Sequence, residues 1–195
     1  MIDNKTRCDW PGSNELMQKY HDEEWGVPNH DDRKWFEYIT LDAFQAGLSW
    51  AIVLNKRENF RRAFNNFDPN QIAEFDNNKI KKLIQDVGII RNKIKINATI
   101  HNAKIFLKVQ NEFGTFDKYI WKFVNGKPII NSWKSMSELP AHTVESDLLS
   151  KDLKSRGFKF VGTTICYAFM QSAGMVNDHQ IDCYRYKEIQ QLPIL

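Results

Sequence analysis

The sequence predicts an all-α fold, on three observations. Apolar residues recur at steps of three and four from residue 31 onward, which is the period of a helix. Capping residues and closing glycines recur between these segments, and no run alternates apolar and polar residues as a half-buried strand would. With 195 residues and no linker-like stretch, the chain is long enough for one domain with a substantial core. We therefore expect a single helical domain over residues 1–195.

The first two expected helices lie between residues 33 and 67. One spans residues 33–46 and can end at Gly47, and its apolar positions at helical steps are Trp35, Phe36, Ile39 and Ala43. The next begins near Ser49 or Trp50, and its apolar side is formed by Val53, Phe60, Phe64 and Phe67. Both would bury an aromatic face.

Local capping signals predict the next helices. Asp68 followed by Pro69 predicts a short helix through Phe75, and Asp76 could cap another. After a break at residues 88–91, a long helix is expected over 92–112, closed by Gly114, and a shorter one over 116–124, closed by Gly126. Residues 127–142, which hold Pro128 and Pro140, are expected as a loop. Helices over 146–155 and 163–173 follow, with a hairpin at 158–162 between them.

The composition excludes several classes of protein. Six Trp, 13 Phe and six Tyr with 26% charged residues indicate a globular chain rather than a disordered one. No apolar run follows Met1, and no window approaches the ~18 apolar residues of a membrane span, so we expect a soluble, cytoplasmic protein without a membrane partner. Three cysteines in a chain without a signal peptide argue against a disulfide framework, and Cys166 lies in an apolar run as a buried thiol would.

The charge pattern alone does not identify a partner, because a net charge of +3 is small. Two basic stretches stand out, one formed by Lys79, Lys81, Lys82, Arg91, Lys93 and Lys95, the other by Lys151, Lys154, Arg156 and Lys159. Solvated helix faces would account for both stretches. A nucleic-acid partner therefore needs separate support.

Cysteine and histidine occur together at both ends of the chain. Cys8 and His21 lie near the start, and His179 and Cys183 lie four residues apart near the end, a spacing that would place them on one face of a helix. Two cysteines and two histidines suit tetrahedral Zn²⁺, but such residues also occur as ordinary packing residues. Spacing alone leaves both interpretations open. If the four meet, they would close nearly the whole chain as a clasp on a domain folded by other means.

Residues 146–173 form a helix-hairpin-helix pattern. Gly162 would let the backbone approach a ligand closely, and the unpaired amides at the following helix start, at Thr163 and Thr164, attract an anion such as a DNA phosphate. Such a contact binds the DNA backbone without distinguishing one base from another. An ordinary corner between two helices would give the same pattern.

Several longer motifs resemble one family. They are Tyr20–Pro28, Gln45–Trp50, Gly157–Tyr167 and Val176–His179, and they occur in the order found in the bacterial 3-methyladenine DNA glycosylase I family. The resemblance covers Cys8 to Cys183. It implies the all-α fold of the helix-hairpin-helix DNA glycosylase superfamily. It also implies one structural zinc ion that joins the N- and C-terminal segments, bound by the residues that match its ligands: Cys8, His21, His179 and Cys183.

The resemblance further implies base excision repair. The enzyme would flip a damaged nucleotide out of double-stranded DNA that contains alkylated purines, and hydrolyse the N-glycosidic bond of 3-methyladenine. We expect a monomer. Trp50, Tyr20 and Trp10 match aromatic residues of the lesion pocket, where stacking and cation–π attraction suit a flat cationic base. Gly47 and Leu48 match residues that fill the gap left in the duplex. Without the resemblance, a core role would be the better interpretation of Trp50. Tyr20 and Trp10 could pack under the clasp, and Leu48 could be an ordinary buried leucine.

The chain departs from the family pattern at two pocket positions. Asp42 stands where the family has a glutamate, and Met17 replaces a second tyrosine. We expect Asp42, the candidate catalytic residue, to keep the glutamate's recognition role, and Met17 to fill space in the lesion pocket. Asn177 aligns with a superfamily catalytic aspartate, so the adjacent Asp178 is given no catalytic role. No lysine begins the second hairpin helix, which favours a monofunctional enzyme.

Two alternatives remain at this point. The Asp42 and Met17 replacements could mark a relative with altered alkyl-base specificity. The Cys and His residues together with the hairpin could instead form a non-catalytic, zinc-stabilised DNA-binding module.

Overall fold

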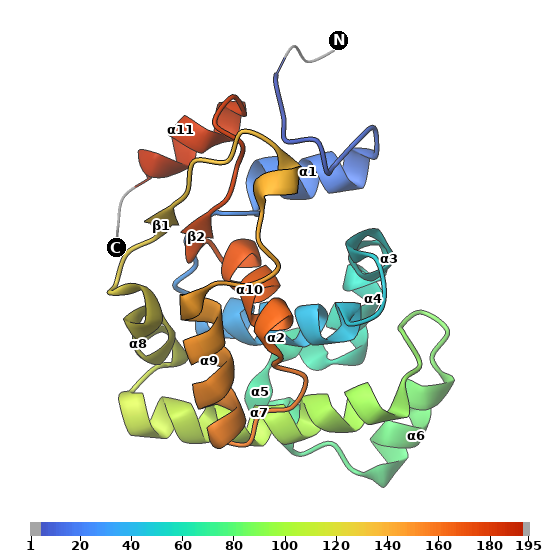
Figure 1. Cartoon of the computed structure of the whole chain (residues 1–195). Coiled ribbons are helices and arrows are strands. Elements are labelled where there is room, and N and C mark those ends of the chain that lie inside the picture. Colours follow the sequence, from blue (N-terminus) through green and yellow to red (C-terminus); the bar gives the residue numbers. More distant parts are fainter. Residues whose placement is uncertain (1–4, 193–195) are drawn as a thin grey trace.

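The computed structural model describes residues 5–192, and most of that chain is helical. The helices α2 (Asp32–Gln45) and α10 (Thr163–Ser172) lie at the centre. The long helix α7 (Lys93–Phe113) lies on one side of this pair, while α1 (Glu15–Glu23) and α11 (Tyr184–Gln190) lie on the opposite side (Figure 1). The N- and C-terminal segments therefore meet at one end of the molecule.

Shorter helices surround this frame. They are α3 (Trp50–Asn55), α4 (Arg57–Ala63), η1 (Asn65–Phe67), α5 (Pro69–Ala73), α6 (Asn77–Gln85), α8 (Phe116–Ile120), η2 (Trp121–Val124), η3 (Met136–Glu138) and α9 (Val144–Ser155). Side chains cap four of them, α5, α6, α8 and α9, and each capping side chain accepts a hydrogen bond from a first-turn amide. Asp68 caps α5 and Asp76 caps α6, as predicted, and Gly114 ends α7. Within the described residues, no helix is long and apolar enough to cross a bilayer.

The helix α2 lies inside the core rather than on its surface. Its residues from Trp35 to Phe44 are all buried, and Trp35, Phe36 and Phe44 have no exposed area. A helix that packs on neighbours all round needs no polar stripe. Because α2 is held on every side, a side chain at its C-terminal end has a fixed position.

The expected helix from Ser49 or Trp50 to Phe67 is three pieces instead of one. The chain breaks at Lys56 and again at residues 64–66, where Asn66 has a φ of 52°. These breaks let the rings of Phe60, Phe64 and Phe67 stack in sequence, with centroid distances of 5.9 and 6.2 Å. The predicted apolar residues are therefore confirmed as buried, whereas the prediction of one continuous helix is wrong.

A pair of very short strands corrects the expectation of a loop over residues 127–142. Strand β1 (Ile129–Ile130) pairs in parallel with β2 (Val176–Asn177), with Ile129 opposite Val176. Two residues are too few to show an alternating pattern in sequence. This pairing fixes the chain just before His179.

The segment from His179 to Cys183 is a turn, so the prediction of a shared helical face is wrong. The Cys183 amide donates to the Gln180 carbonyl at 2.9 Å, and α11 begins only after Cys183. The turn lies between β2 and α11. It brings the two side chains together by folding back rather than by helical periodicity.

Candidate functional site and metal centre

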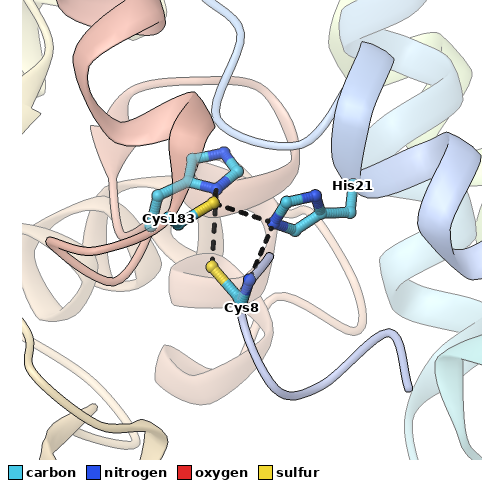
Figure 2. Close-up of side chains that lie close together, drawn as sticks. Cys8, His21 and Cys183 are labelled. Atoms are coloured by element: carbon cyan, nitrogen blue, oxygen red, sulfur yellow. Dashed lines mark hydrogen bonds between the residues drawn. The ribbon is translucent and has the colours of Figure 1, made fainter. Parts of the chain in front are cut away.

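Four side chains from distant parts of the sequence meet at the end of the molecule that holds both terminal segments. Cys8 comes from the N-terminal segment, His21 from α1 and Cys183 from the turn before α11 (Figure 2). His179 comes from the same turn as Cys183. Their potential metal-binding atoms all lie within 4.8 Å of one another, and all four residues are buried. We call these four residues the clasp.

The spacing of the clasp atoms fits a tetrahedral metal ion. The Cys183 sulfur lies 3.5 Å from His21 Nε2 and 3.5 Å from His179 Nδ1, and Cys8 Sγ lies 3.5 Å from His179 Nδ1. Zinc bound tetrahedrally at about 2.3 Å to sulfur and about 2.0–2.1 Å to nitrogen would place such atoms about 3.5 Å apart. The cluster therefore has the donor set and the size of a Cys2His2 zinc site.

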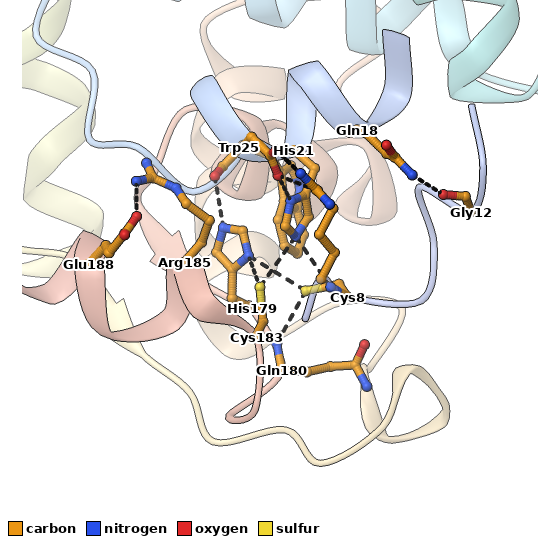
Figure 3. Close-up of polar contacts among 12 residues, drawn as sticks. Cys8, Gly12, Gln18, His21, Trp25, His179, Gln180, Cys183, Arg185 and Glu188 are labelled. Carbon is orange, nitrogen blue, oxygen red and sulfur yellow. Dashed lines mark hydrogen bonds and ion pairs between the residues drawn. The ribbon is translucent and has the colours of Figure 1, made fainter. Parts of the chain in front are cut away.

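Neighbouring groups fix which nitrogen of each histidine faces the cluster. His21 Nδ1 lies 2.8 Å from Asp22 Oδ1, and His179 Nε2 lies 3.0 Å from the Trp25 carbonyl oxygen (Figure 3). Both outer nitrogens must donate to these acceptors, so His21 Nε2 and His179 Nδ1 present lone pairs to the cluster. Although burial opposes it, hydrogen bonds from Arg7 and His21 lower the pKa of Asp22 to about 2.

The proximity of the two thiols of the clasp favours the thiolate form of Cys183. A hydrogen bond between them lowers the pKa of Cys183 and raises that of Cys8, and both imidazoles lower the Cys183 pKa further. One thiolate is thus favoured by proximity alone. Thiolate is the form that binds a metal ion.

A small cavity lies beside the clasp. It has a volume of about 160 Å³. Its lining residues are Trp10, Tyr20, Trp25, Asp42, Gln45, Trp50, Met136, Leu139, Ala168, Gln171 and Ser172. Pockets for drug-sized ligands measure about 300–1,000 Å³. This one suits a smaller molecule, such as a single flat ring.

Four buried polar atoms in this cavity have no hydrogen-bond partner. They are Trp10 Nε1, Tyr20 OH, Asp42 Oδ2 and Trp50 Nε1. Within residues 5–192, Arg185 Nε is the other buried side-chain atom with this property. Buried polar groups are almost always paired, and each unpaired one costs about 1–3 kcal/mol. Four of them around one cavity indicate a binding site for a polar ligand.

Asp42 occupies the last turn of α2 at the cavity wall. It is 1% exposed, and its one hydrogen bond is a long one, from the Ser172 hydroxyl at 3.5 Å. Burial raises the pKa of Asp42 well above its usual range, while the Ser172 hydrogen bond opposes this rise. A ligand that brings positive charge or a hydrogen-bond donor would stabilise the ionised carboxylate.

Aromatic rings provide the rest of the cavity wall. The Tyr20 and Trp50 centroids lie 5.2 Å apart, and the Trp10 and Tyr20 centroids lie 6.2 Å apart. Such faces attract a flat cationic ring by stacking and by cation–π interaction. Together with Asp42, they form a site for a planar, positively polarised ligand.

The structure brings most of the sequence-predicted pocket residues together. Trp10, Tyr20, Asp42 and Trp50 all line the cavity, whereas Met17 packs against the neighbouring buried cluster and is not among the lining residues. Three lining residues of α10 were not predicted: Ala168, Gln171 and Ser172. Their spacing of three and four places them on one helix face. From the sequence, this spacing was the signal that could have indicated a shared lining role for the three residues.

The residues predicted to contact DNA lie outside the cavity lining. Gly47, with a φ of +79°, and Leu48, 40% exposed, occupy the turn between α2 and α3. Gly162 precedes α10, whose first amides receive no side-chain cap. Thr164 is exposed, and the Thr163 hydroxyl donates to Asp147.

Helix α7 forms hydrogen bonds to both segments that were predicted to contact DNA, the end of α2 and the hairpin before α10. Lys95 is buried, and its Nζ donates to the carbonyl oxygens of Phe44 at 2.9 Å and Ala46 at 2.7 Å, at the end of α2. Lys95 thus departs from the solvated basic face expected from the sequence. Asn102 bonds the hairpin through both the amide and the carbonyl of Lys159, at 2.8 and 2.9 Å.

A larger cavity, of about 760 Å³, lies between η2 and α9. Its lining includes Lys122, Glu145 and Lys151, and none of the unpaired buried polar atoms lies there. The smaller cavity is therefore the better candidate site.

Comparison with known proteins agrees with these features. A family model described as methyladenine glycosylase matches residues 10–186. DNA-3-methyladenine glycosylase 1 of Escherichia coli (strain K12) is 49% identical over 180 residues, which cover 92% of this chain and 96% of that protein. DNA-3-methyladenine glycosylase of Haemophilus influenzae is 48% identical over 178 residues, covering 91% and 96%.

Solved structures show the same similarity in three dimensions. A crystal structure of 3-methyladenine DNA glycosylase I (TAG) superposes with a TM-score of 0.89 at 50% identity, covering 92% of this chain and 98% of that one. The Staphylococcus aureus enzyme, solved to show the structural basis of 3-methyladenine recognition, gives a TM-score of 0.88 at 32% identity, covering 91% and 95%.

Proposed function

This chain belongs to the methyladenine glycosylase family, and on that premise we propose that it releases 3-methyladenine from alkylated DNA. It acts as a DNA glycosylase of base excision repair and hydrolyses the bond between base and sugar. The observation that carries this proposal is the set of four unpaired buried polar atoms around a cavity of about 160 Å³. A single modified base could satisfy them, whereas an empty cavity leaves them unpaired.

The cavity chemistry matches the lesion. Adenine methylated at N3 carries positive charge while it is attached to the sugar, and its exocyclic amine donates hydrogen bonds. Trp50, Tyr20 and Trp10 supply aromatic faces for the cation, and Asp42 supplies an acceptor that becomes more stable as an anion beside it. An uncharged purine would gain less from this site. We therefore assign Asp42 to lesion recognition and electrostatic stabilisation.

Cleavage of the bond requires few catalytic groups from the protein. Water attacks the sugar carbon C1′, the bond from C1′ to the base nitrogen breaks, and its electron pair neutralises the departing base. The water proton passes to solvent, and an abasic site remains. Thr163 and Thr164 stand where a bifunctional relative would use a lysine, so we propose that no Schiff base forms and that the enzyme is monofunctional.

Reaching the base requires flipping of the nucleotide out of the stack. We propose that Leu48, exposed on the turn after Gly47, occupies the gap left in double-stranded DNA. The uncapped amides that follow Gly162, at Thr163 and Thr164, would hold a backbone phosphate. The contacts from α7 to both segments support a fixed distance between these two functions.

The clasp would hold one structural zinc ion through Cys8, His21, His179 and Cys183. With four protein ligands, such an ion has no vacant position for a reacting water. Its contribution is to stabilise the segment that carries Trp10 and the helix that carries Tyr20. We further propose one domain over residues 1–195, a monomer, and a cytoplasmic location.

Base release from methylated DNA tests this function. Methylated duplex DNA should lose 3-methyladenine when incubated with the protein, and an Asp42→Ala, Trp50→Ala double variant should lose this activity by about a hundredfold or more. Glu74→Ala, a change at an exposed carboxylate of α5's C-cap, is the matched control and should retain full release.

Other outcomes separate the alternatives. Preferred release of a different alkylated base would indicate an altered specificity. DNA binding without release from any lesion would indicate a non-catalytic module. Unchanged release by the double variant would contradict the assigned pocket.

A further inference from the structure

Asp178 is a fully buried carboxylate surrounded by hydrogen-bond donors. Its Oδ1 accepts from Asn131 Nδ2 at 2.6 Å and from Trp133 Nε1 at 2.8 Å. Its Oδ2 accepts from the Tyr167 hydroxyl at 2.6 Å and from Gln171 Nε2 at 2.7 Å. Each of these groups donates a hydrogen to a carboxylate oxygen of Asp178, so the nitrogen of the Gln171 amide is the atom that faces Asp178.

This arrangement fixes the orientation of the Gln171 amide. Gln171 lies in α10 and lines the small cavity. With its nitrogen held by Asp178, its oxygen Oε1 is the amide atom available to a ligand. Among the residues that the structure describes, none donates a hydrogen bond to Oε1. Because Gln171 lines the cavity, Oε1 is the atom of this side chain that could serve there as a second acceptor besides Asp42.

An oriented acceptor distinguishes purines by the group at position 6. Adenine carries an amine there, which donates hydrogen bonds, whereas guanine and hypoxanthine carry a carbonyl oxygen, which accepts them. We propose that Gln171 is a specificity-determining residue that accepts a hydrogen from the exocyclic amine of 3-methyladenine, and that Asp178 is the positioning residue that holds its amide in that orientation. This inference rests on the proposed function and extends it to the choice between bases.

The variant Asp178→Asn should reverse the orientation of the Gln171 amide. Trp133 Nε1 can only donate, so the oxygen of the new amide must remain on the Trp133 side. Its nitrogen then faces Tyr167 and Gln171. The Tyr167 hydroxyl can accept from it, but the Gln171 amide must rotate and present Oε1. The Gln171 nitrogen would then face the cavity as a donor.

Binding of free bases tests the proposal directly. The Kd values of 3-methyladenine and 3-methylhypoxanthine, which has a carbonyl in place of the amine, are measured through the fluorescence of the cavity tryptophans. We expect the wild-type protein to prefer 3-methyladenine by about ten- to a hundredfold. Asp178→Asn should lower this preference at least about tenfold, and Gln171→Ala should lower it about fivefold or more.

The double variant and a control make the test specific. In the Gln171→Ala background, Asp178→Asn should not change the preference further, because no amide remains to rotate. Tyr167→Phe removes another hydrogen bond to Asp178 and leaves the Gln171 contact, so it should lower the melting temperature and retain the preference within about threefold. Zinc content is measured for each variant, since Asp178 adjoins a clasp residue.

An unchanged preference in folded Asp178→Asn, or an equal change with and without Gln171, would overturn the proposal. If Asp178→Asn does not fold, Gln171→Ala decides, and an unaltered preference there also overturns it. Wild-type protein that shows the base preference but releases no 3-methyladenine from methylated DNA would contradict the proposed function and uphold the selectivity mechanism.

Discussion

The clasp and the small cavity lie beside each other, and both bury polar side chains. The two regions differ in whether these polar atoms have hydrogen-bond partners. In the clasp, both nitrogens of His21 and of His179 have partners within 3.5 Å. In the cavity, four buried polar atoms have none. Paired groups stabilise the fold, while unpaired groups lower its stability and retain their binding capacity for a ligand. The difference separates a structural centre from a binding site.

Breaking the clasp should have the largest effect. Cys183→Ala removes one of the four proposed zinc ligands, so we expect loss of zinc from the purified protein and a fall in melting temperature of roughly 10 °C or more. Calorimetry and elemental analysis measure these two changes. Cys166→Ala is the matched control, because Cys166 is a buried thiol outside the clasp, and it should keep its zinc. Equal melting of Cys183→Ala and wild type would show that the clasp does not stabilise the fold.

Changing Asp42 should affect activity and stability in opposite directions. We expect Asp42→Asn to reduce 3-methyladenine release by about ten- to a hundredfold, because the carboxylate no longer balances the cationic base. The same change should raise the free energy of unfolding by about 1–3 kcal/mol, because a neutral amide replaces a buried carboxyl whose ionised form is opposed by burial and whose Oδ2 has no partner. Single-turnover release and urea unfolding measure the two effects. A loss of stability would contradict the description of Asp42 Oδ2 as an unpaired buried atom.

The pH dependence of unfolding tests the raised pKa of Asp42. The folded-state pKa of Asp42 is raised, so the folded protein keeps this proton at pH values where the unfolded chain has lost it. The contribution of Asp42 to stability is therefore complete below about pH 4 and declines as pH rises toward the folded-state pKa. Urea unfolding from pH 4 to 8 should show a decline in wild type that is reduced in Asp42→Asn. Parallel curves would argue against a raised pKa.

A smaller effect, limited to duplex DNA, is expected at Leu48. Leu48→Ala should reduce release from duplex DNA by roughly tenfold, because stacking of the neighbouring bases is no longer replaced by an apolar side chain. Binding of free 3-methyladenine should not change, since Leu48 does not line the cavity. Ile52→Ala, which alters a similarly exposed residue of α3, is the control. A change in free-base binding would place Leu48 in the lesion pocket instead.

The smallest effect is expected at Met17. Since Met17 packs against the buried cluster and does not line the cavity, Met17→Leu should alter release by less than about threefold. Single-turnover release on methylated DNA measures this. A loss of tenfold or more would show that Met17 contacts the base.

Local features of the fold were predictable from sequence, and long-range ones were not. Asp68 and Asp76 act within one helical turn, so their capping roles follow from neighbouring residues. The clasp joins Cys8 to His179 across 171 residues, and spacing alone could not decide whether they meet. Only the family resemblance connected them, and the helical face expected for His179 and Cys183 is a turn.

The same limit applies within the candidate site. The roles of Trp10, Tyr20, Asp42 and Trp50 were predicted from the family resemblance, and the structure gathers these residues at one cavity. The helical spacing of Gln171 with Ala168 and Ser172 could have indicated a lining residue, but the orientation of its amide depends on a buried carboxylate beyond its own helix. Partner geometry of this kind arises from packing, which no local pattern records.

The clasp also has a consequence for synthesis of the protein. Ribosomes deliver the N-terminus first, so Cys8 and His21 emerge long before His179 and Cys183 can join them. Trp10 and Tyr20 belong to the segments that this late contact holds in place. A nascent chain, or one truncated before Cys183, would therefore lack a completed lesion pocket. If the clasp forms as proposed, competence to bind a damaged base would be acquired only at the end of translation.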